Sequence, residues 1–270
     1  MNVGVVGVGN MGRHYVNKLL LLGYKPVLID KDQEALARFN DELKKYTDLD
    51  TALKENELDF LFVATAPTSH IPIAKKALER EINVMVEKPP TLSSSELEET
   101  INLALSKGVS LGVSEIELRS SCIRKFEKKG TYESIEAYRL NLGQGYINPF
   151  FDLAWHDLYI LQYLFDDIKI KKAIDLGDIY EVYGETREGE FFIKVGWNQA
   201  NLRREWILTQ GEEKTIFDFT TDTIHYPKGI SVEGDKKDKL EMMITEFLTN
   251  PTFDSSFRAL KVLKQMEKIV

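Results

Sequence analysis

The residues with the clearest chemical potential lie in one short stretch, Val84-Met85-Val86-Glu87-Lys88-Pro89-Pro90. Its three apolar residues read as a buried strand, and the two prolines end it because neither can donate a ladder hydrogen bond. The strand therefore brings Glu87 and Lys88 to its carboxyl end, which is where ligands bind in an open α/β sheet. A lysine held beside a ligand can do acid–base work, whereas a lysine in an ordinary turn is only solvated.

A second candidate pair is Asp152 and His156, which are four residues apart in a stretch whose leucines suit a packed helix. This spacing predicts that the two side chains share one helix face. Imidazole gains and loses a proton near neutral pH, and a neighbouring carboxylate can orient it. The alternative is a core histidine on a helix that Asp152 caps at its N-terminus.

A glycine-rich turn near the start of the chain predicts a phosphate-binding site. The apolar run at residues 3–6 leads into Gly7-Val8-Gly9-Asn10-Met11-Gly12, and a helical pattern follows. Gly7 permits the tight turn, Gly9 lets a pyrophosphate approach the backbone, and Gly12 lets the helix pack closely on the strand. The N–H groups at the start of the helix favour phosphates.

The acidic residue after the second predicted strand indicates which dinucleotide binds. Asp30 lies 18 residues past Gly12, where a carboxylate can accept hydrogen bonds from a ribose diol. The same carboxylate would repel a 2′-phosphate, although Lys31 beside it softens that repulsion. We therefore expect NAD as the cofactor, with NADP as the less favoured alternative.

The first half of the chain alternates strand-like and helical patterns, which predicts a doubly wound parallel sheet. We expect helices at residues 34–43, from Asp50, after His70 and from Ser93 to Gly108. Residues 1–117 are thus predicted to form an α/β Rossmann domain that binds NAD(P).

The pattern changes after about Leu118. An amphipathic helix is expected to end at Gly130, and two helices are expected at residues 237–248 and 256–268. Six strand-like segments with short connections predict a largely antiparallel open sheet. Residues 118–270 are thus predicted to form an α+β substrate-binding and oligomerisation domain. The predicted strands are residues 134–142, 168–176, 179–186, 190–197, 205–209 and 214–219.

These motifs together resemble the glucose–fructose oxidoreductase/inositol dehydrogenase (Gfo/Idh/MocA) family across essentially the whole chain. The matching pieces are the glycine-rich turn, the Ala-Thr-x-Pro-Thr-x-His stretch that ends at His70, and Glu87-Lys88-Pro89. The Asp-x-x-x-His motif at Asp152 and His156 matches as well. The resemblance implies that Lys88, Asp152 and His156 are catalytic. It also implies a set of cofactor-binding residues: Gly7, Gly9, Asn10, Met11, Gly12, Asp30, Thr65, Ala66, Pro67, His70, Glu87 and Lys88.

The function implied is an NAD(P)-dependent oxidoreductase that transfers a hydride between the nicotinamide and a carbinol of a sugar, cyclitol or sugar nucleotide. In this mechanism His156 accepts the hydroxyl proton, Lys88 stabilises the charge on the same oxygen and Asp152 orients the substrate. Other branches of the family use the lysine for proton transfer, so His156 and Lys88 stay alternatives for that role. A dehydrogenase or reductase of another small carbonyl or dihydrodiol, and a catalytically weak dinucleotide sensor, are the competing interpretations.

Two departures from the family leave the substrate open. The run before Asp152, residues 143–151, is shorter and more aromatic than is usual. Arg139, Asn141, Arg203 and Arg204 are candidates for contact with a phosphate or carboxylate, although solvated or interface roles are expected for each.

Composition bounds the remaining expectations. The 270 residues carry a formal net charge of −8, which argues against nonspecific binding to nucleic acid or to an anionic membrane. A single cysteine, Cys122, cannot form an internal disulfide and fits a cytoplasmic protein, where we expect it to pack. The four histidines show no paired spacing for a metal site. The large antiparallel sheet suggests a homodimer or homotetramer.

Overall fold

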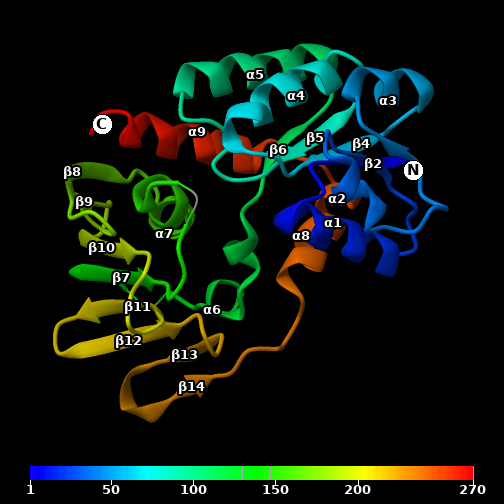
Figure 1. Cartoon of the computed structure of the whole chain (residues 1–270). Helices are drawn as coiled ribbons and strands as arrows, with labels where there is room; N and C mark the ends of the chain where they lie inside the picture. The colour runs from blue at the N-terminus through cyan, green and yellow to red at the C-terminus, as the bar shows by residue number, and fades with distance from the viewer. Residues whose placement is uncertain (129, 146, 270) are drawn as a thin grey trace. The chain divides into compact units, whose positions relative to one another are not determined.

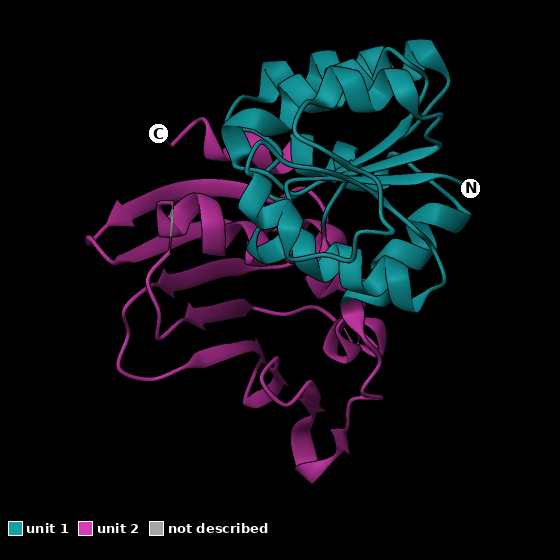
Figure 2. Ribbon diagram, turned by 45° about the vertical axis from the view of Figure 1, so that its right-hand side comes forward, with its two compact units in different colours: residues 1–114, 240–260 teal, residues 115–239, 261–270 magenta. Residues whose placement is uncertain are grey.

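The computed structural model describes residues 1–128, 130–145 and 147–269 of the chain (Figure 1). The chain forms two compact units, coloured separately in Figure 2. Unit 1 comprises residues 1–114 and 240–260, and unit 2 comprises residues 115–239 and 261–270. The units differ from the two contiguous ranges 1–117 and 118–270, because residues 240–260 belong to unit 1. Tyr146, part of the aromatic run before Asp152, lies outside the described residues.

Unit 1 is built on a parallel sheet with the strand order β3-β2-β1-β4-β5-β6, as predicted. Nearly all residues of its five longest strands are buried, which fits a sheet covered on both faces. The order reverses between β1 and β4, so the carboxyl ends of these strands form the switch point where such sheets bind ligands. The strands are β1 (Val3–Val6), β2 (Val27–Ile29), β3 (Lys45–Tyr46), β4 (Phe60–Val63), β5 (Asn83–Val86) and β6 (Leu111–Val113).

The helices of this alternating part lie near the predicted positions, with three corrections. The helix expected from Asp50 begins at Leu49, because Asp48 is its N-cap and accepts the N–H of Thr51, and the helix expected after His70 already begins at Pro67. The helix expected at residues 34–43 ends at Ala37, because the Asn40 side chain accepts the N–H of Glu42 and forms a turn. Ser93 caps the N-terminus of α5 through the N–H of Glu96, and Gly108 ends this helix in the left-handed region. The helices are α1 (Asn10–Leu21), α2 (Gln33–Ala37), α3 (Leu49–Glu55), α4 (Pro67–Leu78) and α5 (Ser94–Lys107).

The C-terminal segment completes unit 1. Helix α8 (Lys239–Thr249) carries Phe247, whose ring contacts Phe60 and Phe62 of β4. Phe62 also contacts Tyr15 of α1, so α8 lies on the same face of the sheet as α1 (Figure 1). At the start of α9 (Asp254–Met266), Ser255 Oγ accepts the N–H of Val113 on the edge strand β6 at 2.9 Å. Residues 240–260 thereby cover one face and one edge of the parallel sheet.

Unit 2 is built on a mostly antiparallel sheet with the order β14-β13-β12-β11-β7-β10-β9-β8, in which β7 and β10 pair in parallel. All six predicted strands are present, and the short β13 and β14 were not predicted. The strands are β7 (Ser134–Leu140), β8 (Lys169–Asp175), β9 (Ile179–Glu185), β10 (Glu190–Gly196), β11 (Arg203–Gln210), β12 (Glu213–Asp218), β13 (Thr223–His225) and β14 (Ser231–Val232).

The helical parts of unit 2 differ more from expectation. The helix expected to end at Gly130 is only one turn long, because Phe126 leaves it to pack against Tyr132 and Phe217. The helix that carries His156 begins with a π-helical turn, which the sequence pattern did not indicate. The bounds are η1 (Ile116–Arg119), α6 (Ser121–Arg124), the π-helical η2 (Phe150–Ala154), α7 (Trp155–Phe165) and η3 (Pro227–Gly229).

Candidate active site

The glycine-rich turn of unit 1 leaves room for a phosphate group. A Cβ at Gly12 would lie 1.7 Å from the carbonyl oxygen of Gly7, so only glycine lets α1 start this close to the turn. A Cβ at Gly9, in contrast, would meet no atom within 4 Å. Gly9 is also the N-cap residue of α1 and supplies no side-chain acceptor to the first turn, which carries no acidic residue. These features fit the pyrophosphate of a dinucleotide.

Asp30 follows β2 and holds the glycine-rich turn in place. Its Oδ2 accepts the N–H of Val8 at 2.8 Å, and its Oδ1 accepts the N–H of Asp32 at 3.0 Å. Each carboxylate oxygen retains a further lone pair. Asp30 can thus fix the turn and still accept a ribose hydroxyl, which stays a prediction.

His70 links the two loops that follow β4 and β5. It is 1% exposed on α4, with Nε2 2.9 Å from the carbonyl oxygen of Thr65 and Nδ1 3.0 Å from that of Pro89. Burial is the main cause that lowers the pKa of His70, and a neutral ring can donate to only one of the two carbonyls. Both ring nitrogens face backbone, so we assign His70 to holding these loops. The loop after β4 leads into α4, with Ala66 as the N-cap residue and Pro67 as the first residue of the helix.

Glu87 anchors the turn that carries Lys88. The hydroxyl of Tyr15 on α1 donates to Glu87 Oε1 at 2.6 Å, and the backbone N–H of Lys88 lies 3.1 Å from Oε2. The bond between Lys88 and Pro89 is cis. The Glu87 carboxylate is therefore engaged within unit 1 and orients the turn.

In unit 2, His156 lies in the first turn of α7 and contacts Tyr159. Its Nδ1 is 3.1 Å from the Tyr159 hydroxyl, which accepts the backbone N–H of Glu117 at 3.0 Å. Burial raises the pKa of Tyr159 far above its ordinary value, so the hydroxyl keeps its proton. Asp152 lies in the preceding π-helical turn, and such turns are frequent at functional sites.

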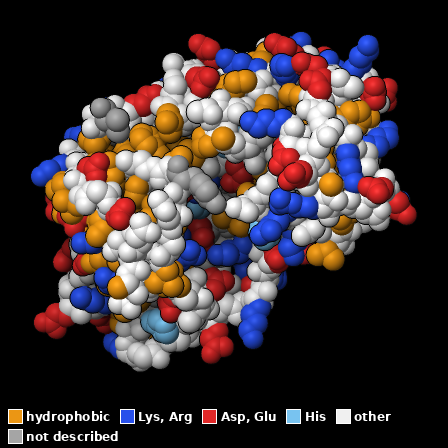
Figure 3. Space-filling model, in the orientation of Figure 1, with side chains coloured by type: hydrophobic (Ala, Val, Ile, Leu, Met, Phe, Trp, Pro, Cys, Tyr) orange, Lys and Arg blue, Asp and Glu red, His pale blue; other side chains and the backbone are white. Residues whose placement is uncertain are grey.

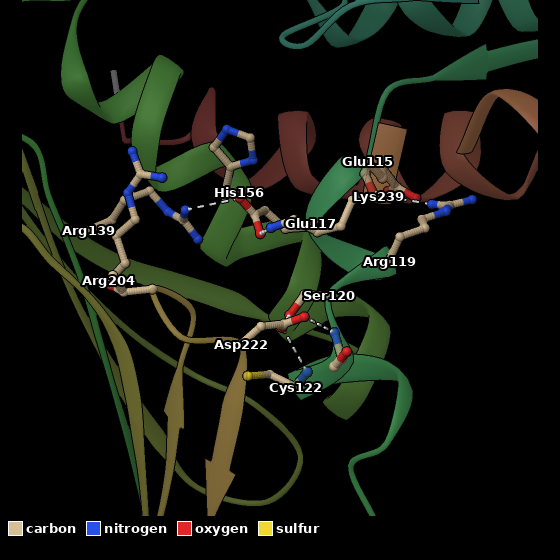
Figure 4. Close-up of polar contacts among 12 residues, drawn as sticks. Glu115, Glu117, Arg119, Ser120, Cys122, Arg139, His156, Arg204, Asp222 and Lys239 are labelled. Carbon is tan, nitrogen blue, oxygen red and sulfur yellow. Dashed lines mark hydrogen bonds and ion pairs between the residues drawn. The ribbon is translucent and has the colours of Figure 1, made fainter. Parts of the chain in front are cut away.

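A buried network of charged side chains connects α7 to β7 and η1. Arg139 on β7 donates from Nε and Nη2 to the two carboxylate oxygens of Asp157, each at 3.0 Å, and Trp206 donates to Asp157 at 2.8 Å. Arg139 also lies 3.6 Å from Glu117, which Lys239 contacts at 2.9 Å (Figure 4). The network fixes Asp157, and with it the backbone of the adjacent His156.

The pKa shifts agree with this pairing. Burial opposes ionisation of Glu117, yet Arg139 and Lys239 outweigh it and lower its pKa. Burial likewise opposes the charge of Arg139, and Asp157 and Glu117 overcome it and raise its pKa. The expectation of a solvated or interface Arg139 is therefore wrong, since this side chain is almost fully buried. The alternation of side chains along β7 could have predicted this burial, because Arg139 shares a sheet face with Ile135 and Ala137.

Cys122 is buried, and burial raises the pKa of its thiol to about 12, so it packs rather than reacts. Within residues 1–128, 130–145 and 147–269, no group of three potential metal ligands comes together. No helix in this described part of the chain is both long and apolar enough to cross a membrane.

The N-terminal part of the sequence matches a known family. Residues 1–115 match the GFO/IDH/MocA family, described as an oxidoreductase family with an NAD-binding Rossmann fold. Residues 1–115 thus match the NAD-binding Rossmann fold of an oxidoreductase family. Over these residues, which are fewer than half of the chain, the sequence is similar to the Gfo/Idh/MocA family, as its motifs predict.

Similar proteins extend this comparison. The chain is 27% identical over 165 residues to the UDP-N-acetylglucosamine 3-dehydrogenase of Acidithiobacillus ferrooxidans, a match that covers 58% of this chain and 52% of that protein. It is 29% identical over 114 residues to an inositol 2-dehydrogenase/D-chiro-inositol 3-dehydrogenase of Lacticaseibacillus casei, covering 40% of this chain and 33% of the relative. The matched sequence thus spans about half or less of these relatives.

The fold similarity covers the whole chain. The structure of the Acidithiobacillus ferrooxidans enzyme aligns with a TM-score of 0.88 at 21% identity, covering 100% of this chain and 96% of that one. The WlbA dehydrogenase of Bordetella pertussis, solved with NADH and UDP-GlcNAcA, aligns with a TM-score of 0.78 at 16% identity, covering 100% and 95%. At these identities the match confirms the fold: a Rossmann unit joined to a mostly antiparallel sheet.

Proposed function

We propose that the protein is an NAD-dependent oxidoreductase that transfers a hydride between the nicotinamide and a carbinol of a sugar, cyclitol or sugar nucleotide. The observation that carries the proposal is the Glu87-Lys88-Pro89 turn, anchored through Tyr15 at the carboxyl edge of an NAD-binding sheet. The substrate class rests on the dehydrogenases of sugar nucleotides and inositols to which the chain is similar.

The hydrogen bonds around Tyr159 suggest how His156 and Lys88 divide their roles. The Tyr159 oxygen already accepts the Glu117 N–H, and the described residues offer its own hydrogen one acceptor, Nδ1 of His156. A neutral His156 ring that accepts at Nδ1 carries its proton on Nε2. It can then donate a hydrogen bond to a substrate oxygen but has no lone pair there to act as a base.

We therefore assign proton removal from the substrate hydroxyl to Lys88, and donation to the substrate oxygen to His156. This assignment chooses between the two alternatives that the sequence leaves open. Bound NAD would supply the hydride acceptor. Asp152 is assigned to orienting the substrate, and the glycine-rich turn and Asp30 to binding the dinucleotide.

The test compares two replacements of His156. A glutamine can still donate from a position near the former Nε2, whereas alanine cannot. We expect His156→Gln to retain much more activity than His156→Ala, and Lys88→Gln to lose about 100- to 10,000-fold in kcat. NADH formation is measured with a panel of cyclitols, aldoses and UDP-sugars.

His225→Gln is the matched control, because this exposed histidine lies on β13 and contacts Ser231. If His156→Gln were as inactive as His156→Ala while Lys88→Gln kept its activity, histidine would be the base. If wild type bound NAD but oxidised no member of the panel, the oxidoreductase proposal would lose its support.

We also propose that the protein acts in the cytoplasm as a homodimer or homotetramer. The outer face of the unit 2 sheet supports assembly, because aromatic residues lie half-buried on it, including Tyr138 and Phe192. Acidic and basic side chains are interspersed over the face drawn in Figure 3, without the continuous basic surface that a polyanion needs. Sedimentation velocity at micromolar concentration tests the oligomeric state.

A further inference from the structure

Two arginines lie opposite each other under α7. Arg204 on β11 pairs directly with Arg139 on β7 in the antiparallel register. Side chains in such a pair project from the same face of the sheet, and their Cβ atoms are about 4.5–5.5 Å apart. Two like charges so close destabilise a sheet unless each has a compensating partner.

The compensation of the two charges is unequal. Arg139 has the carboxylates of Asp157 and Glu117. Among the described residues, Arg204 hydrogen-bonds the side-chain oxygen of Asn141, which lies 3.0 Å from Nε and 2.8 Å from Nη2, and Glu117 and Asp157 act on it only at longer range. Within the described parts of the chain, no carboxylate forms an ion pair with Arg204. Burial and the repulsion from Arg139 lower the pKa of Arg204, so the charged form of this half-buried side chain is less stable than that of a solvated arginine.

Asn141 fixes the direction in which Arg204 can bind. Asn141 is almost fully buried, its N–H donates to the Gly196 carbonyl at 2.9 Å and its carbonyl accepts the Gln199 N–H at 2.9 Å. Its side-chain oxygen occupies the edge of the Arg204 guanidinium formed by Nε and Nη2. The edge formed by Nη1 and the second hydrogen of Nη2 remains for a ligand. That edge matches the two oxygens of a carboxylate or phosphate.

This edge belongs to the same part of unit 2 as His156. Asp157, which binds Arg139, is the residue next to His156, and Asp157 and Glu117 both act electrostatically on Arg204. Figure 4 shows the guanidinium groups of Arg139 and Arg204 on the side of the network where the His156 ring lies. A substrate bound at His156 could therefore contact the guanidinium group of Arg204, which Asn141 already orients within unit 2.

We propose that Arg204, oriented by Asn141, binds an anionic group of the substrate and selects charged sugars over neutral ones. The group is a carboxylate, as in a uronic acid, or a phosphate, as in a sugar phosphate or sugar nucleotide. The inference rests on the proposed function and narrows its substrate class. Arg204 is a specificity residue here, and the hydride and proton transfers do not pass through it.

The test measures binding directly, using protein saturated with NADH so that no sugar is oxidised. Isothermal titration calorimetry compares D-glucose, D-glucuronate, glucose 1-phosphate and UDP-glucose. We expect at least one charged ligand to bind about tenfold or more tightly than glucose. Arg204→Gln should weaken that ligand about 10- to 100-fold and leave glucose unchanged. Arg204→Lys should recover part of the lost affinity, because lysine restores the positive charge but not the paired N–H donors of the guanidinium group.

Arg203→Gln is the matched control. It removes the same charge one residue earlier on β11, from the opposite sheet face, where Arg203 pairs with Glu205 and stacks on Tyr138. We expect this variant to bind each ligand within about twofold of wild type. Which ligand loses affinity in Arg204→Gln distinguishes a carboxylate from a phosphate. Circular dichroism confirms that each variant is folded.

Two results would overturn the inference, and they separate it from the proposed function. If Arg204→Gln bound every charged ligand as wild type does while wild type oxidised a sugar, the proposed function would stand and Arg204 would be structural. If wild type bound none of the four ligands and oxidised no sugar in the panel, both would fail.

Discussion

At the scale of single residues, the position of the proton on the His156 ring depends on the side chains around it. Tyr159 is fully buried, keeps its proton and stands between the imidazole and the backbone of Glu117. In the proposed arrangement the Tyr159 hydroxyl, which accepts the Glu117 N–H, gives its own hydrogen to this ring nitrogen. Tyr159 would then be a positioning residue that sets which nitrogen of His156 carries the proton.

This assignment predicts the tautomer of His156 and the effect of removing the hydroxyl. In ¹⁵N spectra of histidine-labelled protein at pH 8, the signal assigned through His156→Gln should report a proton on Nε2. Tyr159→Phe should produce a mixture of tautomers and lower kcat about three- to tenfold, the worth of one hydrogen bond.

Tyr163→Phe, a change at an exposed position of the same helix, should alter neither the tautomer of His156 nor kcat. A wild-type ring protonated on Nδ1 would contradict the assignment and return the role of base to His156.

At the scale of elements, His70 lies between the loops after β4 and β5, with one ring nitrogen at a carbonyl oxygen of each loop. Burial lowers the pKa of His70, so the folded state holds the neutral ring. The unfolded chain then binds more protons than the folded one as the pH falls below about 6.5. The contribution of His70 to stability is complete above that pH and is lost as the pH falls toward its folded pKa.

The prediction is that His70→Gln makes stability less dependent on pH. The wild-type free energy of unfolding in urea should fall between pH 7.5 and 5.5 by more than that of His70→Gln. NAD affinity should fall in the variant at both pH values, because glutamine cannot reach both loops. His225→Gln, at an exposed position, should keep the wild-type pH slope. Equal slopes in wild type and His70→Gln would show that His70 does not titrate in this range.

Elements with a strong local signal were predicted from the sequence. The glycine-rich turn needs particular backbone angles, and the strand before Glu87 is a run of apolar residues that prolines end. The π-helical turn at Asp152 and the burial of Arg139 were missed. The burial of Arg139 depends on partners that are distant in sequence, since Arg139 is neutralised by Asp157 and by Glu117. A local window predicts a strand or helix but not which charge from another element will face it.

At the scale of the whole molecule, the Rossmann unit depends on residues from the far end of the chain. Phe247 covers Phe60 and Phe62, and a Cβ on Gly112 would already lie 2.9 Å from its ring. A buried aromatic ring in such a contact contributes about 3–5 kcal/mol. The sheet that binds the dinucleotide is thus stabilised by a side chain outside the sequence that matches the family.

We expect Phe247→Ala to destabilise the protein by about 3–5 kcal/mol and to weaken NAD binding, although this residue lies more than a hundred positions after the matched segment. Phe257→Ala is the matched control, because that ring on α9 is 45% exposed and should cost little. Urea denaturation and calorimetry with NAD measure both effects. Equal stability of the two variants would show that α8 is dispensable for unit 1.

The late return of residues 240–260 also has a consequence for synthesis. A ribosome makes a protein from its N-terminus, and domains usually fold as soon as their last residue emerges. Here the first parallel strands emerge more than two hundred residues before the helix that covers them. Part of one apolar face of the nascent Rossmann sheet is therefore expected to stay uncovered until residues 240–260 have been synthesised. A chaperone that recognises exposed apolar strands should consequently stay bound to this chain until α8 and the start of α9 have left the ribosome.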